Sequence, residues 1–547
     1  MIFPWGDHRP DDPEGALWDI VVIGAGLGGG LLGSALAQNG LKTLFLERGP
    51  AVSPLPRGRR SIRTRRFLSE AELASRGRWG KLVAARLGGR SRPVQIPLGN
   101  GPGGSSAIYA ATLERFLRED FEGCGEGEVE PPPMPNRWPI SYHELLPYYR
   151  KAEEALRVCG SRDPSDPDDD SALRTPPPLS ERDEVIFRDF EEAGLRPFRV
   201  HLGIDYEPGC AECLGDLCPK DCKSDGASRG LKPALAQFGA KLLTDFEVER
   251  LDAEGDGVRG AIGRCQGRKM TIRGKVFVLA AGALATPLIL MNSKSPEWPA
   301  GLGNNNDLVG RGLMFHVGQT FVMRTPRARS AAGPAKSMSS RIFNKVGGKR
   351  LGGVQSFTGR VKVGQIANYI VDLIESKIPF RIHGARLGAL ALATVAAPMF
   401  RDCAIFGAQT EDFAYRGNRV LLDPQSPSGF SVVYDATKDL LERASLLRKT
   451  LKAHLRGRLM MFVSRVQLNF GHPAGTCRFG DSPLSSVLDP SGKVRGMCNL
   501  YVADASFMPS ISASHPALTV AAHALRVADI ITREWWPDRW TAQSYRR

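Results

Sequence analysis

The sequence predicts an α/β fold, α+β overall, in which a βαβ domain built from both ends of the chain is interrupted by a second domain. Three observations predict it. A strand–helix–strand pattern opens the chain, and apolar strand and helix patterns return over residues 467–547. The region between them contains short alternating strands typical of an antiparallel sheet with helices. The 547 residues also exceed what one hydrophobic core usually organises.

The first element is an apolar stretch over residues 18–23, suited to a buried parallel strand. The glycine-rich turn Gly24-Ala25-Gly26-Leu27-Gly28-Gly29 follows, and then a helix from about residue 30 to 39 that Gly40 ends. A second strand over residues 42–46 leads to Glu47. This order is that of a βαβ unit.

The residues of this unit suit a dinucleotide. Gly24 permits a tight turn, Gly26 lets a pyrophosphate approach the backbone, and Gly29 lets helix and strand pack closely. The helix N-terminus offers free N–H groups to phosphates. Glu47 can accept hydrogen bonds from ribose hydroxyls, and it would repel the 2′-phosphate that Arg48 could otherwise accommodate. The unit therefore predicts a Rossmann-like dinucleotide-binding domain.

Two histidines near the C-terminus are candidates for acid/base chemistry. His472 lies in Gly-His-Pro-Ala-Gly-Thr-Cys and His515 in Ser-His-Pro-Ala-Leu-Thr, and an apolar strand ending at Asp504 runs between them. Histidine is the side chain whose proton moves near neutral pH. The alternative is that each is a hydrogen-bonded turn histidine.

Further elements follow from pattern and capping. Ser141 and Glu144 form a capping box for a helix over residues 141–158. We also expect a strand over residues 275–281 with a helix over 283–291, strands over 419–422 and 430–434, and a helix over 439–456. Residues 161–178, rich in Asp, Ser and Pro, predict an exposed loop.

The formal net charge of +15 is concentrated between residues 57 and 92, where twelve Lys and Arg face two acids. Such a segment suits nucleic acid, anionic lipid or an anionic substrate. Aromatic residues barely interleave with these arginines, so no nucleic-acid partner is expected. A solvated surface segment is the favoured interpretation, with peripheral contact to an anionic membrane as the alternative.

No apolar run is long enough to span a bilayer. The most apolar run, residues 387–400, is short and contains Pro398; it suggests a hydrophobic substrate, a lid, or a buried helix, which is the favoured interpretation. The first residues lack the pattern of a secretory signal. A cytoplasmic location, with the peripheral membrane contact as an addition, is therefore expected, and cysteines there are more often thiols or metal ligands than disulfides.

With both ends in view, the chain resembles the glucose–methanol–choline (GMC) family of FAD-dependent oxidoreductases over nearly its whole length. The motifs that carry the resemblance occur in the family's order. They are the turn at residues 24–29 with Glu47, residues 99–106 (Gly-Asn-Gly-Pro-Gly-Gly-Ser-Ser), residues 138–140 with 147–149, residues 279–283 (Leu-Ala-Ala-Gly-Ala), residues 308–311 with His316, and the two histidine blocks.

The resemblance implies a set of FAD contacts. The turn at residues 103–106 would lie beside the pyrophosphate and the isoalloxazine edge. Val248 would contact the adenine side, Asp504 would lie near the phosphates and ribityl chain, and the helix opened by residues 515–517 would point at the flavin. The implied cofactor-binding residues beyond the first turn and Glu47–Arg48 are Gly103, Gly104, Ser105, Ser106, Tyr109, Val248, Ala281, Asp504, His515, Pro516 and Ala517.

Tyr109 marks a departure from the family pattern. The family often has Asn shortly after the second glycine turn, whereas this chain reads Ala-Ile-Tyr-Ala over residues 107–110. Tyr109 therefore either faces the flavin or substrate or is a core tyrosine.

The resemblance implies FAD-dependent oxidation of an alcohol, a primary or sugar-type hydroxyl, by hydride transfer to flavin. His472 matches the general base, and His515 matches a partner position that would hold the alcohol oxygen. The small-molecule alcohol is one partner, and the electron acceptor is O2 or a carrier protein or quinone. A non-redox lyase that contains FAD is a rival interpretation.

Four cysteines lie within thirteen residues: Cys210, Cys213, Cys218 and Cys222. Thiols at such spacings can ligate an iron–sulfur cluster or zinc, and some sugar dehydrogenases of the family carry an iron–sulfur cluster in a comparable segment. A membrane-associated flavoprotein that passes electrons through this cluster is therefore a second rival. Local disulfides, or thiols that pack a loop, are the alternatives.

The predicted domain layout follows from the order of motifs. Residues 15–130, 225–322 and 467–547 form the FAD-binding domain. Residues 131–224 form a connecting or cap segment that holds the cysteines, and residues 323–466 form the substrate-binding domain.

Overall fold

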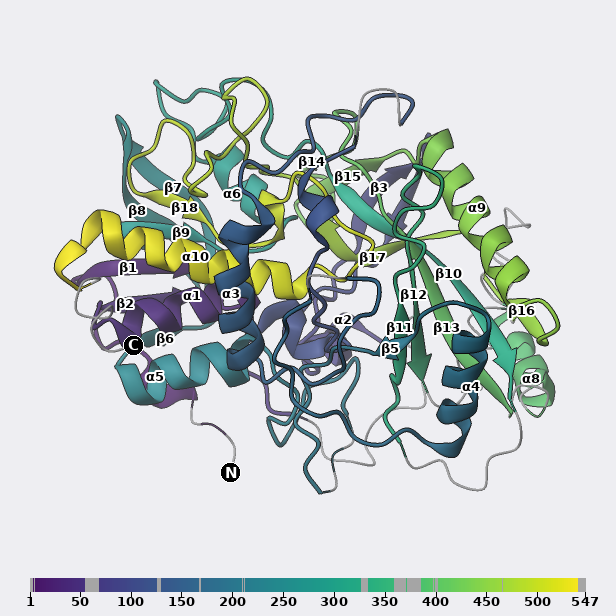
Figure 1. Cartoon of the computed structure of the whole chain (residues 1–547). Coiled ribbons are helices and arrows are strands. Elements are labelled where there is room, and N and C mark those ends of the chain that lie inside the picture. Colours follow the sequence, from purple (N-terminus) through teal and green to yellow (C-terminus); the bar gives the residue numbers. More distant parts are fainter. Residues whose placement is uncertain are drawn as a thin grey trace.

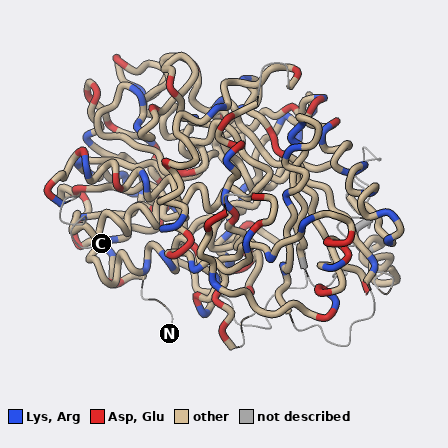
Figure 2. The backbone as a smooth tube through the Cα atoms, in the orientation of Figure 1, with Lys and Arg blue, Asp and Glu red and all other residues tan. Residues whose placement is uncertain are grey.

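The computed structural model describes residues 3, 5–54, 68–124, 129–166, 169–208, 210, 212–325, 333–358, 370, 385–396, 398, 402–464 and 466–539. Figure 1 shows two neighbouring regions, one around the strands β1, β2 and β9 and the other around β10, β12 and β13. In Figure 2, Lys and Arg are interspersed with Asp and Glu along the described chain.

The first region is a seven-stranded sheet in which both ends of the chain meet. Four strands are parallel to β1: β1 pairs directly with β2 and β9, β6 pairs with β2, and β18 pairs with β9. On the other side of β9, β8 and β7 continue the sheet as antiparallel strands. The strands are β1 (Leu17–Ile23), β2 (Thr43–Leu46), β6 (Lys241–Leu243), β7 (Phe246–Glu254), β8 (Gly257–Cys265), β9 (Arg268–Leu279) and β18 (Leu500–Val502).

Helices α1 (Leu27–Gln38) and α10 (Ala517–Trp535) pack against each other beside this sheet, and α3 (Tyr142–Ala155) and α5 (Lys232–Phe238) contact them (Figure 1). The apolar run of β1 is buried from Ile20 to Ile23 because it pairs on both sides and is covered by helices. The predicted βαβ unit is thereby confirmed, as is the capping box of Ser141 and Glu144.

The second region is a seven-stranded antiparallel sheet, with helices α4 (Glu181–Glu192) and α9 (Lys438–His454) against it. The long strand β10 is its centre, pairing with β13 on one edge and with β16 and β17 on the other. Its strands are β5 (Phe198–Arg199), β10 (Met314–Arg324), β11 (Met338–Ser340), β12 (Gly353–Thr358), β13 (Cys403–Thr410), β16 (Met460–Phe462) and β17 (Gln467–Ala474).

β10 and β17 connect the two regions. β10 begins nine residues before the expected start of the substrate domain at 323, and β17 lies beyond its expected end at 466. β17 carries His472, and β10 carries His316. The domain boundaries stay predictions, but this sheet brings both histidines to its end nearest the first region.

The predicted strands over residues 419–422 and 430–434 are confirmed as the antiparallel pair β14 (Arg419–Leu422) and β15 (Phe430–Tyr434). They lie in a separate four-stranded sheet, where β15 pairs in parallel with β3 (Val83–Leu87), which itself pairs with β4 (Arg90–Val94). The end of the arginine-rich segment, from residue 83 onwards, thus lies in a hairpin, and residues 57–67 of that segment lie outside the described residues.

One expectation about exposure holds in part, and another is wrong. Residues 161–178 form an irregular segment whose described residues are mostly exposed or half-buried, but Asp163 within it is 0% exposed, because Arg341 pairs with it. The apolar run over residues 387–400 overlaps helix α8 (Ala385–Ala396), which is not a buried helix: Leu390 and Leu392 are exposed, and Val395 is 77% exposed. Residues 397, 399 and 400 of that run are outside the described part.

The remaining helices are short: α2 (Glu70–Ala74), α6 (Thr286–Asn292), the 3-10 turns η1 (Trp5–His8), η3 (Gly104–Ile108), η4 (Arg118–Phe121) and η7 (Ala505–Phe507), and the π-turn η5 (Gly226–Leu231). Within the described chain, no helix combines the length and apolar character that crossing a bilayer requires.

Candidate active site

Three histidines from three separate segments meet between the two regions. The rings of His472, on β17, and His515, just before α10, have centroids 5.0 Å apart. On the other side of His472, the ring of His316 on β10 lies at 5.1 Å. His316 is fully buried, whereas the other two are half-buried. The structure therefore brings the two sequence-predicted histidines together and adds a third.

The hydrogen bonds assign the protons on this triad. The Nε2 atom of His316 lies 2.6 Å from the carbonyl oxygen of Ser512, which can only accept, so this nitrogen carries the proton. The neutral ring then has a lone pair at Nδ1, which lies 3.1 Å from Nδ1 of His472. His472 must donate there, and its Nε2 atom is left with a free lone pair.

Asn469 supports His472 from the same strand. Its amide nitrogen lies 3.2 Å from Nδ1 of His472, and its Oδ1 accepts a hydrogen bond from the backbone of Gly471. With the Nδ1 proton of His472 directed at His316, the Asn469 amide cannot also donate to that nitrogen, and its contribution is the hydrogen bond that its Oδ1 accepts from Gly471.

The site keeps all three imidazoles neutral. Burial lowers the pKa of His316 to about 4. Burial also holds the pKa of His472 well below its ordinary value, reinforced by His316 and by the ammonium of Lys336. The same causes, with Lys336 ahead of the two histidines, lower the pKa of His515. A neutral imidazole with a free Nε2 can accept a proton.

A cavity of about 320 Å³ opens beside His515. Strands of the second region and the loop before α10 form its wall. The wall has both polar and apolar surface, and its amide, hydroxyl and charged residues are Glu114, Gln319, Thr320, Ser339, Arg341, Gln355, Gln409, Ser464, Gln467, Asn469 and Ser514.

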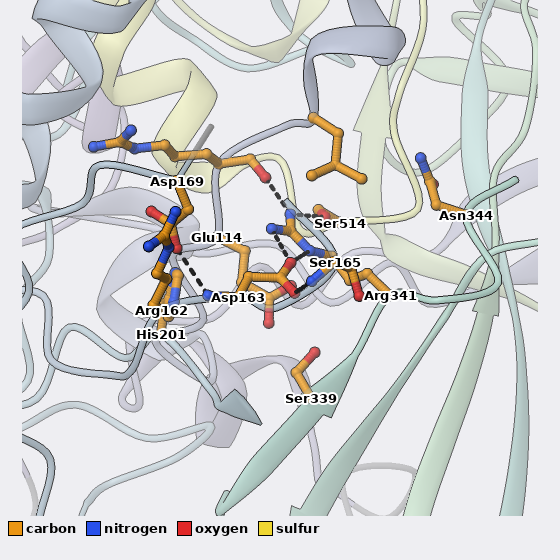
Figure 3. Close-up of polar contacts among 12 residues, drawn as sticks. Glu114, Arg162, Asp163, Ser165, Asp169, His201, Ser339, Arg341, Asn344 and Ser514 are labelled. Atoms are coloured by element: carbon orange, nitrogen blue, oxygen red, sulfur yellow. Dashed lines mark hydrogen bonds and ion pairs between the residues drawn. The ribbon is translucent and has the colours of Figure 1, made fainter. Parts of the chain in front are cut away.

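Arg341 fixes one side of this cavity. Figure 3 shows its guanidinium between Asp163 and Ser514, with Glu114 and Ser339 nearby. Nε donates to Asp163 at 2.6 Å, and NH1 donates to the carbonyl of Arg115 at 2.6 Å and to Oγ of Ser514 at 3.2 Å. Asp163 thus anchors, through Arg341, the residue that precedes His515.

The predicted glycine turn has the geometry of a phosphate cradle. Gly24 has φ +105°, and a Cβ on Gly29 would lie 2.1 Å from the Gly24 carbonyl oxygen, as the predicted roles in turning and packing require. A Cβ on Gly26 would meet no atom within 4 Å. Space is therefore open at the one glycine assigned to the pyrophosphate.

The second glycine turn packs directly on the first. Gly103 donates to the carbonyl of Ala25 at 2.8 Å, and a Cβ on Gly104 would approach Cα of Gly26 to 3.0 Å. Ser105 Oγ accepts from the Gly99 backbone, and Ser106 Oγ donates to the Gly103 carbonyl. These two turns, adjacent in space, fit a ligand that carries phosphates.

Other predicted cofactor residues are held by backbone contacts. Glu47 is buried and accepts from the N–H groups of Ala25, Gly49 and Gly101. Arg48 stacks on Trp79 at 3.9 Å. Its guanidinium has a lowered pKa, because burial outweighs the neighbouring Glu47 and Glu247.

Asp504 connects the strand β18 with the motif at residues 279–283. It accepts from Gly282 N at 2.8 Å, from Thr286 Oγ1 at 2.5 Å and from Ser506 N at 2.9 Å. Ala281, in the same motif, is half-buried. Val248 is buried on β7 in the first region. Residues 515–517 open α10, with Pro516 as the N-cap.

The Tyr109 hydroxyl donates to the carbonyl of Ser224 at 2.6 Å. Burial raises the pKa of this hydroxyl, so it stays protonated and bound to the backbone. The contact fits the alternative of a core tyrosine better than that of a group facing substrate.

The four cysteines gather into one cluster, but the metal prediction for them is not supported. Cys218 and Cys222 have sulfur atoms 3.4 Å apart, with Cys213 and Cys210 packed against them. A hydrogen bond from Cys213 lowers the pKa of Cys218, whereas burial raises that of Cys222. Among the residues that the structure describes, no group of three or more His, Cys, Asp or Glu has an arrangement suited to a metal ion.

Sequence reasoning assigned no role to His316, Lys336, Glu114 or Arg341. His316 was visible only as part of a family motif. The other three carry no local signal, since a lone Lys, Glu or Arg in an irregular stretch most often lies in solvent. Only the folded arrangement shows that they are buried beside the histidines.

Comparison with known proteins agrees with this geometry. A model of the N-terminal part of GMC oxidoreductases matches residues 21–318, and one of their C-terminal part matches residues 422–524. The 6'''-hydroxyparomomycin C oxidase of Streptomyces lividus is 28% identical over 96% of this chain and 93% of its own length. The paromamine 6'-oxidase of Streptomyces fradiae is 28% identical over 96% and 92%. The 2-methyl-1,2-propanediol dehydrogenase of Mycolicibacterium austroafricanum is 26% identical over 94% and 95%.

Solved structures share the fold. Pyridoxine 4-oxidase from Mesorbium loti superposes with a TM-score of 0.60 at 20% identity, over 95% of this chain and 99% of its own. A fungal aryl-alcohol oxidase superposes with a TM-score of 0.60 at 16% identity, over 96% and 100%. The paired glycine turns, the histidine site and the two family models lead to one conclusion: the chain belongs to the GMC oxidoreductase family, as an FAD-dependent enzyme that oxidises CH–OH groups.

Proposed function

We propose that this enzyme oxidises a primary or sugar-type hydroxyl group, with His472 as the base that removes the hydroxyl proton. The observation that carries the proposal is the hydrogen bond between His472 and His316. It uses Nδ1 of His472 and leaves the Nε2 lone pair free. Because the imidazole is held neutral, that lone pair is available to a substrate proton at ordinary pH.

His515 is suited to hold the substrate oxygen. Its Nδ1 atom has no hydrogen-bond partner among the described residues. Its ring adjoins both His472 and the cavity. A neutral imidazole donates from one nitrogen, so His515 can stabilise the negative charge that develops on the oxygen as His472 takes the proton. His472 therefore acts as the base, and His515 acts as the hydrogen-bond donor to the substrate oxygen.

The residues at the glycine turns would hold the cofactor. The open space at Gly26, the turn at residues 103–106 and the N-terminus of α10 form the frame, and Asp504 and Val248 extend it on the first sheet. FAD, when bound, supplies the hydride acceptor. The α10 N-terminus adds a partial positive charge that favours negative charge nearby.

The cavity supports a polyhydroxylated substrate. Its wall presents amide and hydroxyl side chains from several strands, which suit the many donors and acceptors of a sugar-type alcohol. Two relatives bear names that state activity on 6'''-hydroxyparomomycin C and on paromamine. A purely apolar alcohol would leave these polar groups unpaired in a buried site, at a cost.

Anaerobic bleaching of the flavin tests this function. The holoenzyme is mixed with a panel of sugars, polyols, paromamine, short aliphatic alcohols and aryl alcohols. We expect polyhydroxylated compounds to reduce the flavin, with an aldehyde or ketone as product. The electron acceptor is identified by comparing reoxidation of the flavin in air, with the hydrogen peroxide formed being measured, with its reoxidation by a quinone. Reduction by none of the hydroxyl compounds, or only by apolar alcohols, would contradict the proposal.

A further inference from the structure

Glu114 is a buried carboxylate on the wall of the cavity. The residue is 2% exposed, and it lines the same space as His515. Among the residues that the structure describes, Gln355 is its one hydrogen-bond donor, at 3.1 Å. A carboxylate can accept several hydrogen bonds through its two oxygens, so this one keeps unused acceptor capacity. A buried charge with so few partners costs stability unless a ligand supplies the missing donors.

A chain of hydrogen bonds behind the wall fixes this carboxylate. The ammonium of Lys336, which can only donate, binds Oγ1 of Thr112. Thr112 directs its own proton to Oε1 of Gln355 at 3.3 Å, so the amide nitrogen of Gln355 is turned to Glu114. Every donor of the chain points toward Glu114. The chain therefore supports the charged form of Glu114 and holds its carboxylate in place.

The other charged residue of the wall does not satisfy Glu114. The guanidinium of Arg341 donates to Asp163, to the carbonyl of Arg115 and to Oγ of Ser514. Asp163 is also its buried ion-pair partner. The charge of Arg341 is thus compensated by the protein itself, and Glu114 is the charged wall residue whose hydrogen-bonding capacity is left for a ligand.

Gln409, on β13, offers a second acceptor to the same cavity. It is half-buried, and its amide nitrogen donates to the carbonyl of Ala513 at 3.2 Å. Because that carbonyl can only accept, the side-chain oxygen of Gln409 is the end left for a ligand. A ligand that contacts both Gln409 and Glu114 must therefore be a hydrogen-bond donor.

We propose that Glu114 binds a protonated amine of the substrate, so that the enzyme selects an amino alcohol of the amino-sugar class over a neutral polyol. An ammonium donates three hydrogen bonds and carries the positive charge that the carboxylate lacks on its cavity side, whereas a hydroxyl group supplies one donor and no charge. Gln409 accepts a further hydrogen bond from the same group. This inference rests on the proposed function, because it names the class of hydroxyl compound that the histidines oxidise.

The test uses pairs of compounds in which an amine replaces one hydroxyl group: glucosamine against glucose, and serinol against glycerol. N-acetylglucosamine, whose nitrogen carries no charge, completes the set. Each compound is titrated anaerobically into the holoenzyme, and its binding is measured by isothermal titration calorimetry. Stopped-flow absorbance then separates the apparent Kd from the limiting rate wherever the flavin is reduced.

Three variants accompany the wild type. Glu114→Gln keeps the shape of the side chain and removes its charge, and Gln409→Leu removes the second acceptor. Glu442→Gln is the matched control, since Glu442 is an exposed residue of α9 that pairs with Lys438.

We expect the wild-type holoenzyme to bind glucosamine about tenfold or more tightly than glucose, and serinol more tightly than glycerol. N-acetylglucosamine should bind no better than glucose. In Glu114→Gln the preference should disappear through weaker binding of the amines, while the limiting rate of flavin reduction changes little, because Glu114 transfers no proton. Gln409→Leu should lose part of the preference and Glu442→Gln none.

Equal binding of the two members of each pair to the wild type, or no binding of either amine, would overturn the inference, and this comparison needs no variant to fold. An amine preference that persists in folded Glu114→Gln protein would overturn it as well. If the amines are preferred through Glu114 but no compound reduces the flavin, the amine site stands and the proposed function fails. If neutral polyols reduce the flavin without any preference for amines, the proposed function stands and the amine site fails.

Discussion

The Nδ1 atom of His472 lies 3.1 Å from the Nδ1 atom of His316, and the far nitrogen of His316 is fixed by the carbonyl of Ser512. This chain of contacts determines which nitrogen of His472 is free. The Ser512 carbonyl cannot donate a hydrogen bond, so it fixes the proton of His316 on Nε2. The Nδ1 atom of His316 is then an acceptor, which fixes the proton of His472 on its own Nδ1. Under the proposed function, the buried His316 affects catalysis by fixing the tautomer of His472.

Two substitutions of His316 test its contacts with His472 and with Ser512 separately. Asn can place an oxygen near the Nδ1 position and keep an acceptor for His472, whereas Gln reaches toward Ser512 and loses that acceptor. We expect His316→Gln to slow flavin reduction by about tenfold or more, because His472 loses its preferred tautomer. His316→Asn should be less affected. Stopped-flow reduction of FAD-replete protein measures both, and equal rates in the two variants would argue against the tautomer assignment.

Two glycines of the first turn, Gly26 and Gly29, provide a second matched pair of substitutions. Gly26→Ala adds a methyl group into space that is open in the protein, so we expect a folded protein with unchanged thermal stability in the apo form but weak FAD binding. Gly29→Ala places a Cβ 2.1 Å from the Gly24 carbonyl, so it should lower the melting temperature of the apo form itself. Absorbance at flavin wavelengths and differential scanning fluorimetry distinguish them. Normal FAD content in Gly26→Ala would contradict the assigned pyrophosphate position.

Asp163 should contribute more to the stability of the protein than a residue in an irregular segment usually does. It pairs with Arg341 while both side chains are almost fully buried. Asp163→Asn leaves the guanidinium without its charged partner, which typically costs about 3–5 kcal/mol in such pairs. Chemical denaturation measures this loss, with Glu249→Gln, at an exposed ion pair with Arg264, as the milder comparison. A loss below that of the comparison variant would show that the pair is not an anchor.

Glu411 makes stability depend on pH. Burial raises its pKa to about 7, against the attraction of Arg350, so the folded protein favours the protonated acid. That stabilisation is fully present below the ordinary Glu value and is lost as pH rises through about 7. Glu411→Gln should therefore flatten the fall in stability between pH 5 and pH 8. Urea unfolding at several pH values measures the slope, and an unchanged slope would assign the pH dependence to other groups.

Local signals explain what the sequence predicted well. Residues 18–47 contain a strand, a turn, a helix, a second strand and an acidic residue in immediate succession, and Ser141 and Glu144 form a capping box at the start of α3. In both cases, residues close together in the sequence are enough to predict the local structure. The helix over 439–456 and the strands over 419–422 and 430–434 likewise match observed elements.

Contacts between segments that are distant in the sequence explain the features that could not be predicted from the sequence. Asp163 has the composition of an exposed loop, and only Arg341, 178 residues away, makes it buried. β15 pairs with β3 from the arginine-rich segment near the N-terminus, which no pattern within either strand indicates. Among the residues that the structure describes, the Lys336 ammonium has one hydrogen-bond partner, Thr112, which is distant in sequence. The candidate histidines were found by their motifs, but their supporting residues were not.

The most direct test of the account is the rate of anaerobic flavin reduction in His472→Ala holoenzyme with a substrate that reduces the wild type. His143→Ala, at an exposed position of α3, is the control. We expect His472→Ala to bind FAD normally but to reduce it about 10²–10⁴-fold more slowly, while the control keeps the wild-type rate. A wild-type rate in FAD-replete His472→Ala would contradict the claim that His472 is the base.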